Sequence, residues 1–191
     1  MKNDDFQALT PQVGKILIAS PFLDGTDFER TVILLITYEN GYMGIVVNKL
    51  SEWNKSVNEL VQDFKDVPDI PVYTGGVVDK DVLFCMHTNP YIANSLDLGN
   101  GVFINGDFPE LVKMTKDSAG LSSRARFFLG YAGWSEGQLE REILQGSWAV
   151  ANADAKFLFT TDISRMWSTA LHSIGEPYCY WVQFPHHPLI N

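Results

Sequence analysis

Few residues of this sequence have the types and spacing that catalysis or metal binding requires. Cys85 and His87 lie two positions apart in an apolar run that is expected to be extended, so both side chains would leave the same face of a strand. This spacing fits a thiolate–imidazole nucleophile or one half of a metal site. The other histidines lie on an expected helix and near the chain end, so the pair has no further ligand close in sequence. An enzyme or redox protein that uses Cys85 and His87 is one hypothesis, and a histidine satisfied within the core is the alternative.

A second candidate is the glycine-rich stretch Gly130–Gln138, whose sequence is GYAGWSEGQ. Ser135 and Gln138 have the spacing of a capping box, so the sequence predicts a strand, a glycine turn at Gly130–Trp134 and then a helix start. Free N–H groups and the helix dipole would attract an anion there. The alternative is that the glycines only allow a tight turn while the aromatic residues fill the core. We expect a small anionic ligand or a protein partner to bind this turn.

Other polar residues near these candidates have simpler alternatives. Asn48 ends the apolar run Met43–Val47, where an asparagine usually bonds nearby backbone but can also line a pocket. Arg124 and Arg126 would share one strand face, either solvated or paired with acids, or acting as anion clamps near the glycine turn. The chain contains no P-loop, nucleophile elbow, HExxH or CxxC motif, which excludes the enzyme classes that these motifs mark. We assign no catalytic residue and expect neither a metal nor another cofactor.

The charge balance bears on the partners of the chain. Its 191 residues include 14 Lys and Arg against 23 Asp and Glu, a formal net charge of −9 at pH 7. Binding to a polyanion gains much of its free energy from cations that replace condensed counterions. This balance therefore disfavours direct binding to nucleic acid and to an anionic membrane, while regulation through a protein partner stays open.

The composition is that of a single globular domain. Hydrophobic residues make up 46% of the chain, which is enough for one substantial core. No window approaches the roughly 18 consecutive apolar residues of a membrane-spanning helix, and the first residues do not resemble a secretion signal, so we expect a cytoplasmic protein. Cys85 and Cys179 lie between apolar neighbours and are expected to be buried thiols. The predicted domain covers residues 14–185, between an irregular segment 1–13 and a tail 186–191.

Apolar and β-branched runs predict strands through most of the chain. The clearest pair is Thr31–Tyr38 with Tyr42–Val47, because the Asn-Gly link between them tolerates the positive φ of a tight hairpin. Gly75 and Gly76 would weaken an ordinary strand, so they predict a bulge or a close approach of another backbone. The other expected strands are Lys15–Ser20, a second hairpin of Val72–Val78 and Val82–His87 around Asp79–Asp81, Gly101–Asn105, Arg124–Leu129 and Tyr178–Phe184.

Helix starts are marked by capping signals. Ser56 and Glu59 have the spacing of a capping box, which predicts a helix through about Phe64, and similar signals follow at Asp107 and Ser135. The clearest helix is the last one, because apolar residues from Ile163 to Ile174 recur at the spacing of one helical face. Together the elements predict an α+β fold, with a mixed, mainly antiparallel sheet containing hairpins and flanked by about four helices.

Five segments stand in a familiar order along the chain, namely Leu17–Pro21, Met43–Lys49, Gly75-Gly76, His87 and above all Gly130–Glu140. Over about residues 14–175 the sequence resembles the bacterial AlgH/YqgE family. The resemblance implies a compact single α+β domain, and the family has no agreed catalytic residues. The family is called a transcriptional regulator after one of its members, and small-molecule and redox roles have also been suggested for it. The motif positions carried over as candidate ligand-binding residues are Asn48, His87, Gly130, Tyr131, Gly133, Trp134 and Gln138. The segment Glu176–Phe184 departs from the usual family ending.

The leading hypothesis is a protein that binds a small anionic ligand or a protein partner through Gly130–Gln138. One alternative is a transcriptional regulator that acts on DNA directly or through a partner, although the net charge opposes direct contact with DNA. The other alternative is the enzyme or redox protein that uses Cys85 and His87.

Overall fold

A computed structural model of the chain describes residues 10–52, 55–67, 69–116 and 124–185. Most of the irregular segment predicted at the N-terminus, residues 1–9, and the whole predicted tail, residues 186–191, lie outside the described residues. Within the described ranges, no helix has the length and apolar character needed to cross a membrane.

The described residues form one mixed sheet with helices on both sides, which confirms the predicted α+β class. Its strands run in the order β6-β7-β5-β8-β3-β2-β1-β9, and β4 pairs with β8 outside this path. Every pairing is antiparallel except that of β4 with β8. The strands are β1 (Lys15–Ala19), β2 (Val32–Tyr38), β3 (Gly41–Val46), β4 (Val72–Thr74), β5 (Val78–His87), β6 (Leu96–Asp97), β7 (Phe103–Ile104), β8 (Ala125–Ser135) and β9 (Trp148–Asn152).

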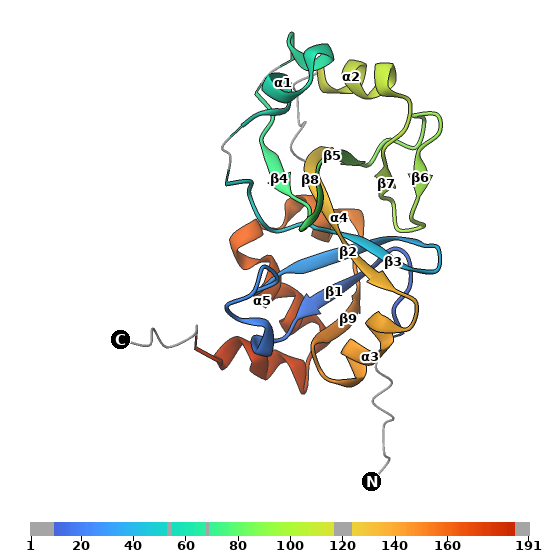
Figure 1. Ribbon diagram of the computed structural model, residues 1–191. Coiled ribbons are helices and arrows are strands. Elements are labelled where there is room, and N and C mark those ends of the chain that lie inside the picture. Colours follow the sequence, from blue (N-terminus) through green and yellow to red (C-terminus); the bar gives the residue numbers. More distant parts are fainter. Residues whose placement is uncertain (1–9, 53–54, 68, 117–123, 186–191) are drawn as a thin grey trace.

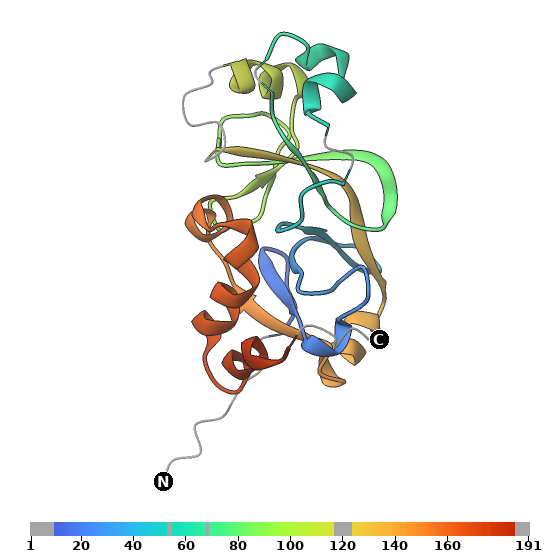
Figure 2. The same cartoon turned by 90° about the vertical axis from the view of Figure 1, so that its left-hand side faces the viewer.

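The helices enclose three apolar cores against this sheet. One core lies between the sheet and the C-terminal helices, which Figure 2 shows along one side of the strands in orange to red. The second lies on the opposite face under α3, and the third lies beneath α1 and α2, at the end of the molecule shown uppermost in Figure 1. The α-helices are α1 (Val57–Leu60), α2 (Phe108–Lys116), α3 (Gln138–Leu144), α4 (Ala155–Thr160) and α5 (Ile163–Ile174), and the 3-10 segments include η1 (Pro21–Leu23), η2 (Gln62–Phe64) and η4 (Tyr178–Gln183).

Three local predictions are confirmed. β2 and β3 form the expected hairpin, and its link uses positive φ at Asn40 (55°) and Gly41 (141°). Ser56 and Glu59 form the expected capping box, with the Ser56 N–H donating to Glu59 Oε2 over 2.8 Å. Helix α5 begins after the N-cap Asp162 and ends at Gly175, as its apolar spacing predicts.

Two predictions about strands are wrong. The expected second hairpin does not form, because β4 and β5 each pair with β8 rather than with each other, and Asp79–Asp81 lies inside β5. The expected closing strand is instead the 3-10 segment η4. Its Tyr178 and Trp181 pack on the core at a spacing of three residues, which suits a 3-10 turn and not an alternating strand.

Candidate functional site

The glycines of the sequence motifs lie where one chain segment crosses another. β4 and β5 both pair with the same residues of β8, one parallel and one antiparallel, so they occupy opposite edges of that strand. The short link through Gly75 and Gly76 therefore has to pass over β8, and it does so at Gly130 and Tyr131. A Cβ atom on Gly75 would overlap the Gly130 carbonyl oxygen, and one on Gly76 would overlap the Tyr131 backbone. The predicted close backbone approach is confirmed, and it explains all three glycines.

The glycine turn predicted at Gly130–Trp134 is wrong, because these residues continue strand β8. Ala132–Ser135 pair with Gly41–Gly44 of β3, so their backbone belongs to a sheet ladder and not to the end of a helix. Helix α3 starts only at Gln138, after Gly137 with φ of 68°, and it is seven residues long. The physical basis proposed for an anion site at this stretch is therefore missing, while a binding role for its side chains stays a prediction.

Trp134 and Gln138 instead attach α3 to the sheet through Glu142. The indole N–H groups of Trp134 and Trp148 both donate to Glu142 Oε2, over 2.9 and 2.8 Å. Gln138 donates to Glu142 Oε1 over 2.9 Å and accepts the Ser135 N–H over 3.0 Å. One carboxylate thus satisfies two largely buried indoles and orients the helix, so these motif residues have a structural role.

Tyr131 and Gly133 lie on the opposite face of β8 from Trp134. Tyr131 donates its hydroxyl hydrogen to Asp79 Oδ2 over 3.2 Å and stands edge-on to Phe84. Gly133 is exposed, and a Cβ atom there would meet only the Tyr131 ring, at 3.4 Å. Both residues border a shallow hollow of about 350 Å³ at the tip of the β2–β3 hairpin, close to Glu39, and Trp134 is also among its lining residues.

Cys85 and His87 are both buried, and neither borders the hollow beside Tyr131 and Gly133. The His87 ring accepts the Asn89 N–H at Nδ1 (3.3 Å), so Nε2 carries the hydrogen donated to the Asn105 carbonyl oxygen (2.7 Å). Burial lowers the pKa of His87 and raises the pKa of the Cys85 thiol, so both are neutral. The interpretation of His87 as a satisfied core residue is supported, and the enzyme hypothesis loses the reactivity of its named pair. Cys179 is only half-buried.

Asn48 and Arg126 also have structural contacts. Asn48 accepts the Val32 N–H over 2.8 Å and donates to the Arg30 carbonyl oxygen over 3.0 Å, so it ties β3 to the neighbouring strand through backbone. Arg126 is buried against aromatic rings and donates to the Phe159 carbonyl oxygen over 3.1 Å. It is therefore neither solvated nor, among the described residues, paired with an acid, which corrects both expectations for it; Arg124 is exposed.

A pocket of about 200 Å³ lies where the sheet forks. β3 and β4 occupy the same edge of β8, β3 along its second half and β4 along its first half. They meet through two backbone bonds, from Val46 N–H to the Gly75 carbonyl (2.7 Å) and from Thr74 N–H to the Lys49 carbonyl (2.9 Å). We call the hollow at this junction the fork pocket. It is lined by Asp27, Phe28, Val46, Lys49, Leu50, Ser51, Glu52, Thr74, Gly76, Val77, Lys80 and Leu129.

The charged lining of the fork pocket comes from three separate segments. Lys49 follows β3, and its ammonium donates to the Asp27 carbonyl oxygen over 2.7 Å. Lys80 comes from a bulge of β5, where the register with β8 shifts between Val78 and Leu83. Within the described part of the chain, the Lys80 ammonium has no hydrogen-bond or ion-pair partner. Two lysines thus border one hollow that apolar residues also line, and the fold alone brings them together.

The comparisons with known proteins place the chain among relatives. A family model described as AlgH-like matches residues 16–179. The chain belongs to the AlgH-like family. The UPF0301 protein BF2109 of Bacteroides fragilis is 38% identical over 182 residues, which cover 95% of this chain and 92% of that protein. The UPF0301 protein CT0663 of Chlorobaculum tepidum is 38% identical over 190 residues, covering 98% and 99%.

Solved structures show the same AlgH-like fold. The solution structure of AlgH from Pseudomonas aeruginosa has a TM-score of 0.69 and 27% identity, covering 98% of this chain and 100% of that one. The crystal structure of DIP2367 from Corynebacterium diphtheriae has a TM-score of 0.74 at 24% identity, covering 93% and 95%. The family is thus established, and its members bring no assigned reaction to this chain.

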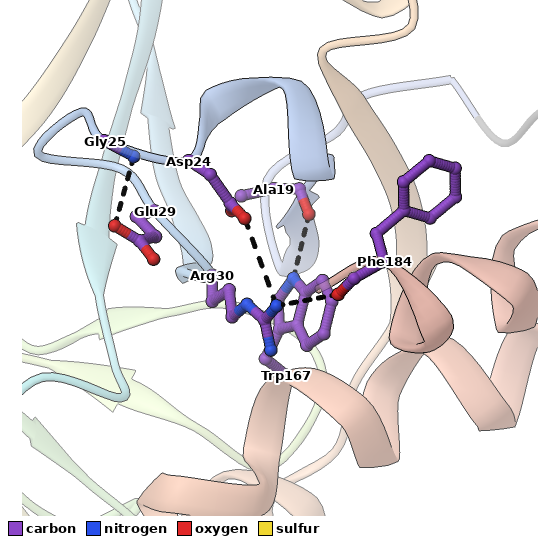
Figure 3. Close-up of polar contacts among 7 residues, drawn as sticks. All are labelled: Ala19, Asp24, Gly25, Glu29, Arg30, Trp167 and Phe184. Carbon is purple, nitrogen blue, oxygen red and sulfur yellow. Dashed lines mark hydrogen bonds and ion pairs between the residues drawn. The ribbon is translucent and has the colours of Figure 1, made fainter. Parts of the chain in front are cut away.

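One wall of the fork pocket is held by a contact to the C-terminal segment of this AlgH-like chain. Asp27 and Phe28 belong to the loop between β1 and β2, which also contains Arg30. Figure 3 shows the Arg30 side chain between Asp24, Trp167 and Phe184. Its Nη2 donates to the Phe184 carbonyl oxygen over 3.0 Å and lies 3.9 Å from Asp24 Oδ2. The Arg30 guanidinium carbon lies 4.9 Å from the Trp167 ring centroid. Phe184 lies beyond the residues that the family model matches.

The sequence motifs contained part of this site. Val46 and Lys49 belong to the Met43–Lys49 segment and Gly76 belongs to the glycine pair, so three residues of recognised segments line the fork pocket. Lys80 and Glu52 lie in polar stretches without any motif, and nothing in their local sequence marks them. No group of three or more His, Cys, Asp or Glu side chains among the described residues is placed to hold a metal ion.

Proposed function

We propose that this AlgH-like protein binds a small ligand that carries a negatively charged group, and that the ligand occupies the fork pocket. The observation that supports the proposal is the position of Lys49 and Lys80 on one hollow, since they come from distant segments. Ligand sites are typically concave and mostly apolar, with a few polar groups that orient the ligand. The fork pocket is concave, and its lining combines apolar residues such as Val46 and Leu129 with the two lysines.

The two lysines should contribute unequally. Lys49 is half-buried and already held by the Asp27 carbonyl, so less side-chain entropy is lost when it binds an anion. Lys80 is exposed, so water and salt screen its charge more strongly. A hydrogen bond to a charged group contributes about 1.5–3 kcal/mol, which corresponds to roughly a tenfold to hundredfold change in Kd. We expect Lys49→Gln to lie within this range and Lys80→Gln below it.

A thermal-shift and calorimetry series tests the proposal. The probes are acetate, butyrate, inorganic phosphate and L-leucine, because a compound that binds only the folded chain raises its melting temperature. A probe that stabilises the parent protein should lose its effect in Lys49→Gln and keep it in Lys156→Gln, whose lysine is exposed on α4 away from the pocket. Unchanged affinity in both Lys49→Gln and Lys80→Gln would refute the assignment.

A further inference from the structure

We infer that the ligand of the fork pocket is a zwitterion of amino-acid size, with a carboxylate and an ammonium group, rather than a simple anion. This inference rests on the proposed function, because it specifies the ligand of the same pocket. It starts from the other two charged residues of the lining, Asp27 and Glu52, which stand beside Lys49 and Lys80.

The four charged residues form no ion pairs with one another. Among the described residues, no ion pair within 4.0 Å joins Lys49 or Lys80 to Asp27 or Glu52. An ion pair between exposed side chains gains at most about 1 kcal/mol, so these charges are not forced to pair. Lys49 is kept apart because its ammonium bonds the main-chain oxygen of Asp27 and not the carboxylate. The lining of the pocket therefore contains residues of both charges that form no ion pair with one another.

This arrangement discriminates between classes of ligand. A phosphate or dicarboxylate would gain from the lysines but would be repelled by the carboxylates of Asp27 and Glu52. A molecule with both charges would place its carboxylate toward the lysines and its ammonium toward the acids. Complementary potentials of this kind set specificity more than total affinity. The lining thus fits a zwitterion better than an anion.

The size and the apolar part of the pocket narrow the class further. About 200 Å³ is less than the roughly 300–1,000 Å³ of sites for drug-sized ligands. That volume suits a single amino acid and not a nucleotide. Leu50 and Val77 border the pocket and are 54% and 39% exposed, so they offer an apolar surface to an aliphatic side chain.

Four related probes separate the contributions of the two charges. L-leucine carries both, N-acetyl-L-leucine keeps only the carboxylate, L-leucinamide keeps only the ammonium, and inorganic phosphate is a plain anion. We expect calorimetry to show that L-leucine binds about tenfold or more tightly than any of the other three, because each lacks one charged contact.

Isosteric substitutions of the acids give opposite results for the two ligand classes. For a zwitterion, Asp27→Asn and Glu52→Gln should each weaken L-leucine binding, together by about tenfold. For a plain anion, both substitutions would strengthen binding by removing repulsion. Asp63→Asn, an exposed acid on η2 away from the pocket, is the matched control and should change nothing. Asp27→Asn keeps the main-chain oxygen that holds Lys49, so the pocket stays built.

The outcomes distinguish the two proposals. Preferential binding of N-acetyl-L-leucine or phosphate, strengthened by Asp27→Asn, would overturn the zwitterion and leave the anion site standing. Tight binding of L-leucinamide that is insensitive to Lys49→Gln would overturn both. Failure of these four probes, and of acetate and butyrate, to bind the parent protein or to raise its melting temperature would also overturn both.

Discussion

Glu142 offers a sharp test of how the tryptophan motif stabilises the fold. Its carboxylate accepts three hydrogen bonds of 2.8–2.9 Å, from the indoles of Trp134 and Trp148 and from the Gln138 amide. The two tryptophans are 6% and 3% exposed, so their N–H groups have little access to replacement water. Glu142→Ala should therefore leave two indole donors largely unsatisfied and release α3 from β8.

The expected cost follows from these contacts. Leaving a buried donor unpaired costs about 1–3 kcal/mol, and part of this is recovered where water reaches the half-buried carboxylate position. We expect the unfolding free energy to fall by about 2–4 kcal/mol, which for a chain of this size lowers the melting temperature by roughly 5–15 °C. Glu142→Gln should lie between, because its amide keeps one acceptor oxygen but turns an NH₂ group toward Gln138.

Urea denaturation followed by tryptophan fluorescence measures this effect. Glu140→Ala is the control on the same helix, since Glu140 is also half-buried and its Oε2 has no hydrogen-bond partner among the described residues. That substitution should change the unfolding free energy by no more than about 0.5 kcal/mol. A loss below about 1 kcal/mol in Glu142→Ala, or an equal loss in Glu140→Ala, would show that the carboxylate does not hold the tryptophans.

Three further predictions concern other parts of the molecule. Gly133→Val should fold normally, because a Cβ atom at this position meets only the Tyr131 ring, and it should leave ligand binding in the fork pocket unchanged. If calorimetry shows that binding is lost, the ligand site lies in the hollow at Gly133 instead. Burial lowers the pKa of His87 below 6.5, so the unfolded chain binds more protons than the folded chain at low pH, and the unfolding free energy should fall as the pH drops below about 6.5. The part of this pH dependence that comes from His87 should disappear in His87→Gln and persist in the exposed control His172→Gln, as urea denaturation at several pH values would measure. Arg30→Met removes the donor to the Phe184 carbonyl, so hydrogen exchange should quicken in residues 24–30 and 178–184; unchanged exchange in both would show that the contact does not hold the loop.

Local sequence patterns were sufficient to predict those elements that are stabilised by residues close together in the sequence. The hairpin of β2 and β3 follows from Asn40 and Gly41, which accept positive φ, and the start of α1 follows from the reciprocal bonds of Ser56 and Glu59. Helix α5 needed only its apolar spacing. The order of motifs also identified the AlgH-like family, because that order is a property of the chain itself.

Predictions that depended on which strands become neighbours were wrong. Asp79–Asp81 has the polar composition of a turn, yet it lies inside β5, because β8 accepts β4 on one edge and β5 on the other. The stretch Gly130–Trp134 has the glycines of a turn, yet partners more than 50 residues away hold it extended. Pairing of distant strands depends on the whole sheet, and no local window contains that information.

The fork pocket shows most clearly which features the sequence determined and which only the tertiary structure decided. The sequence by itself determined the glycines that permit β4, β5 and β8 to cross, the capped helices and a chain poor in cations. Only the tertiary structure decided that Lys49 and Lys80 would share one hollow with Asp27 and Glu52. The physical reason is that side-chain charges act across a few ångströms of space, and distances of that kind are set by the packing of β3, β4 and β8 and not by spacing along the chain.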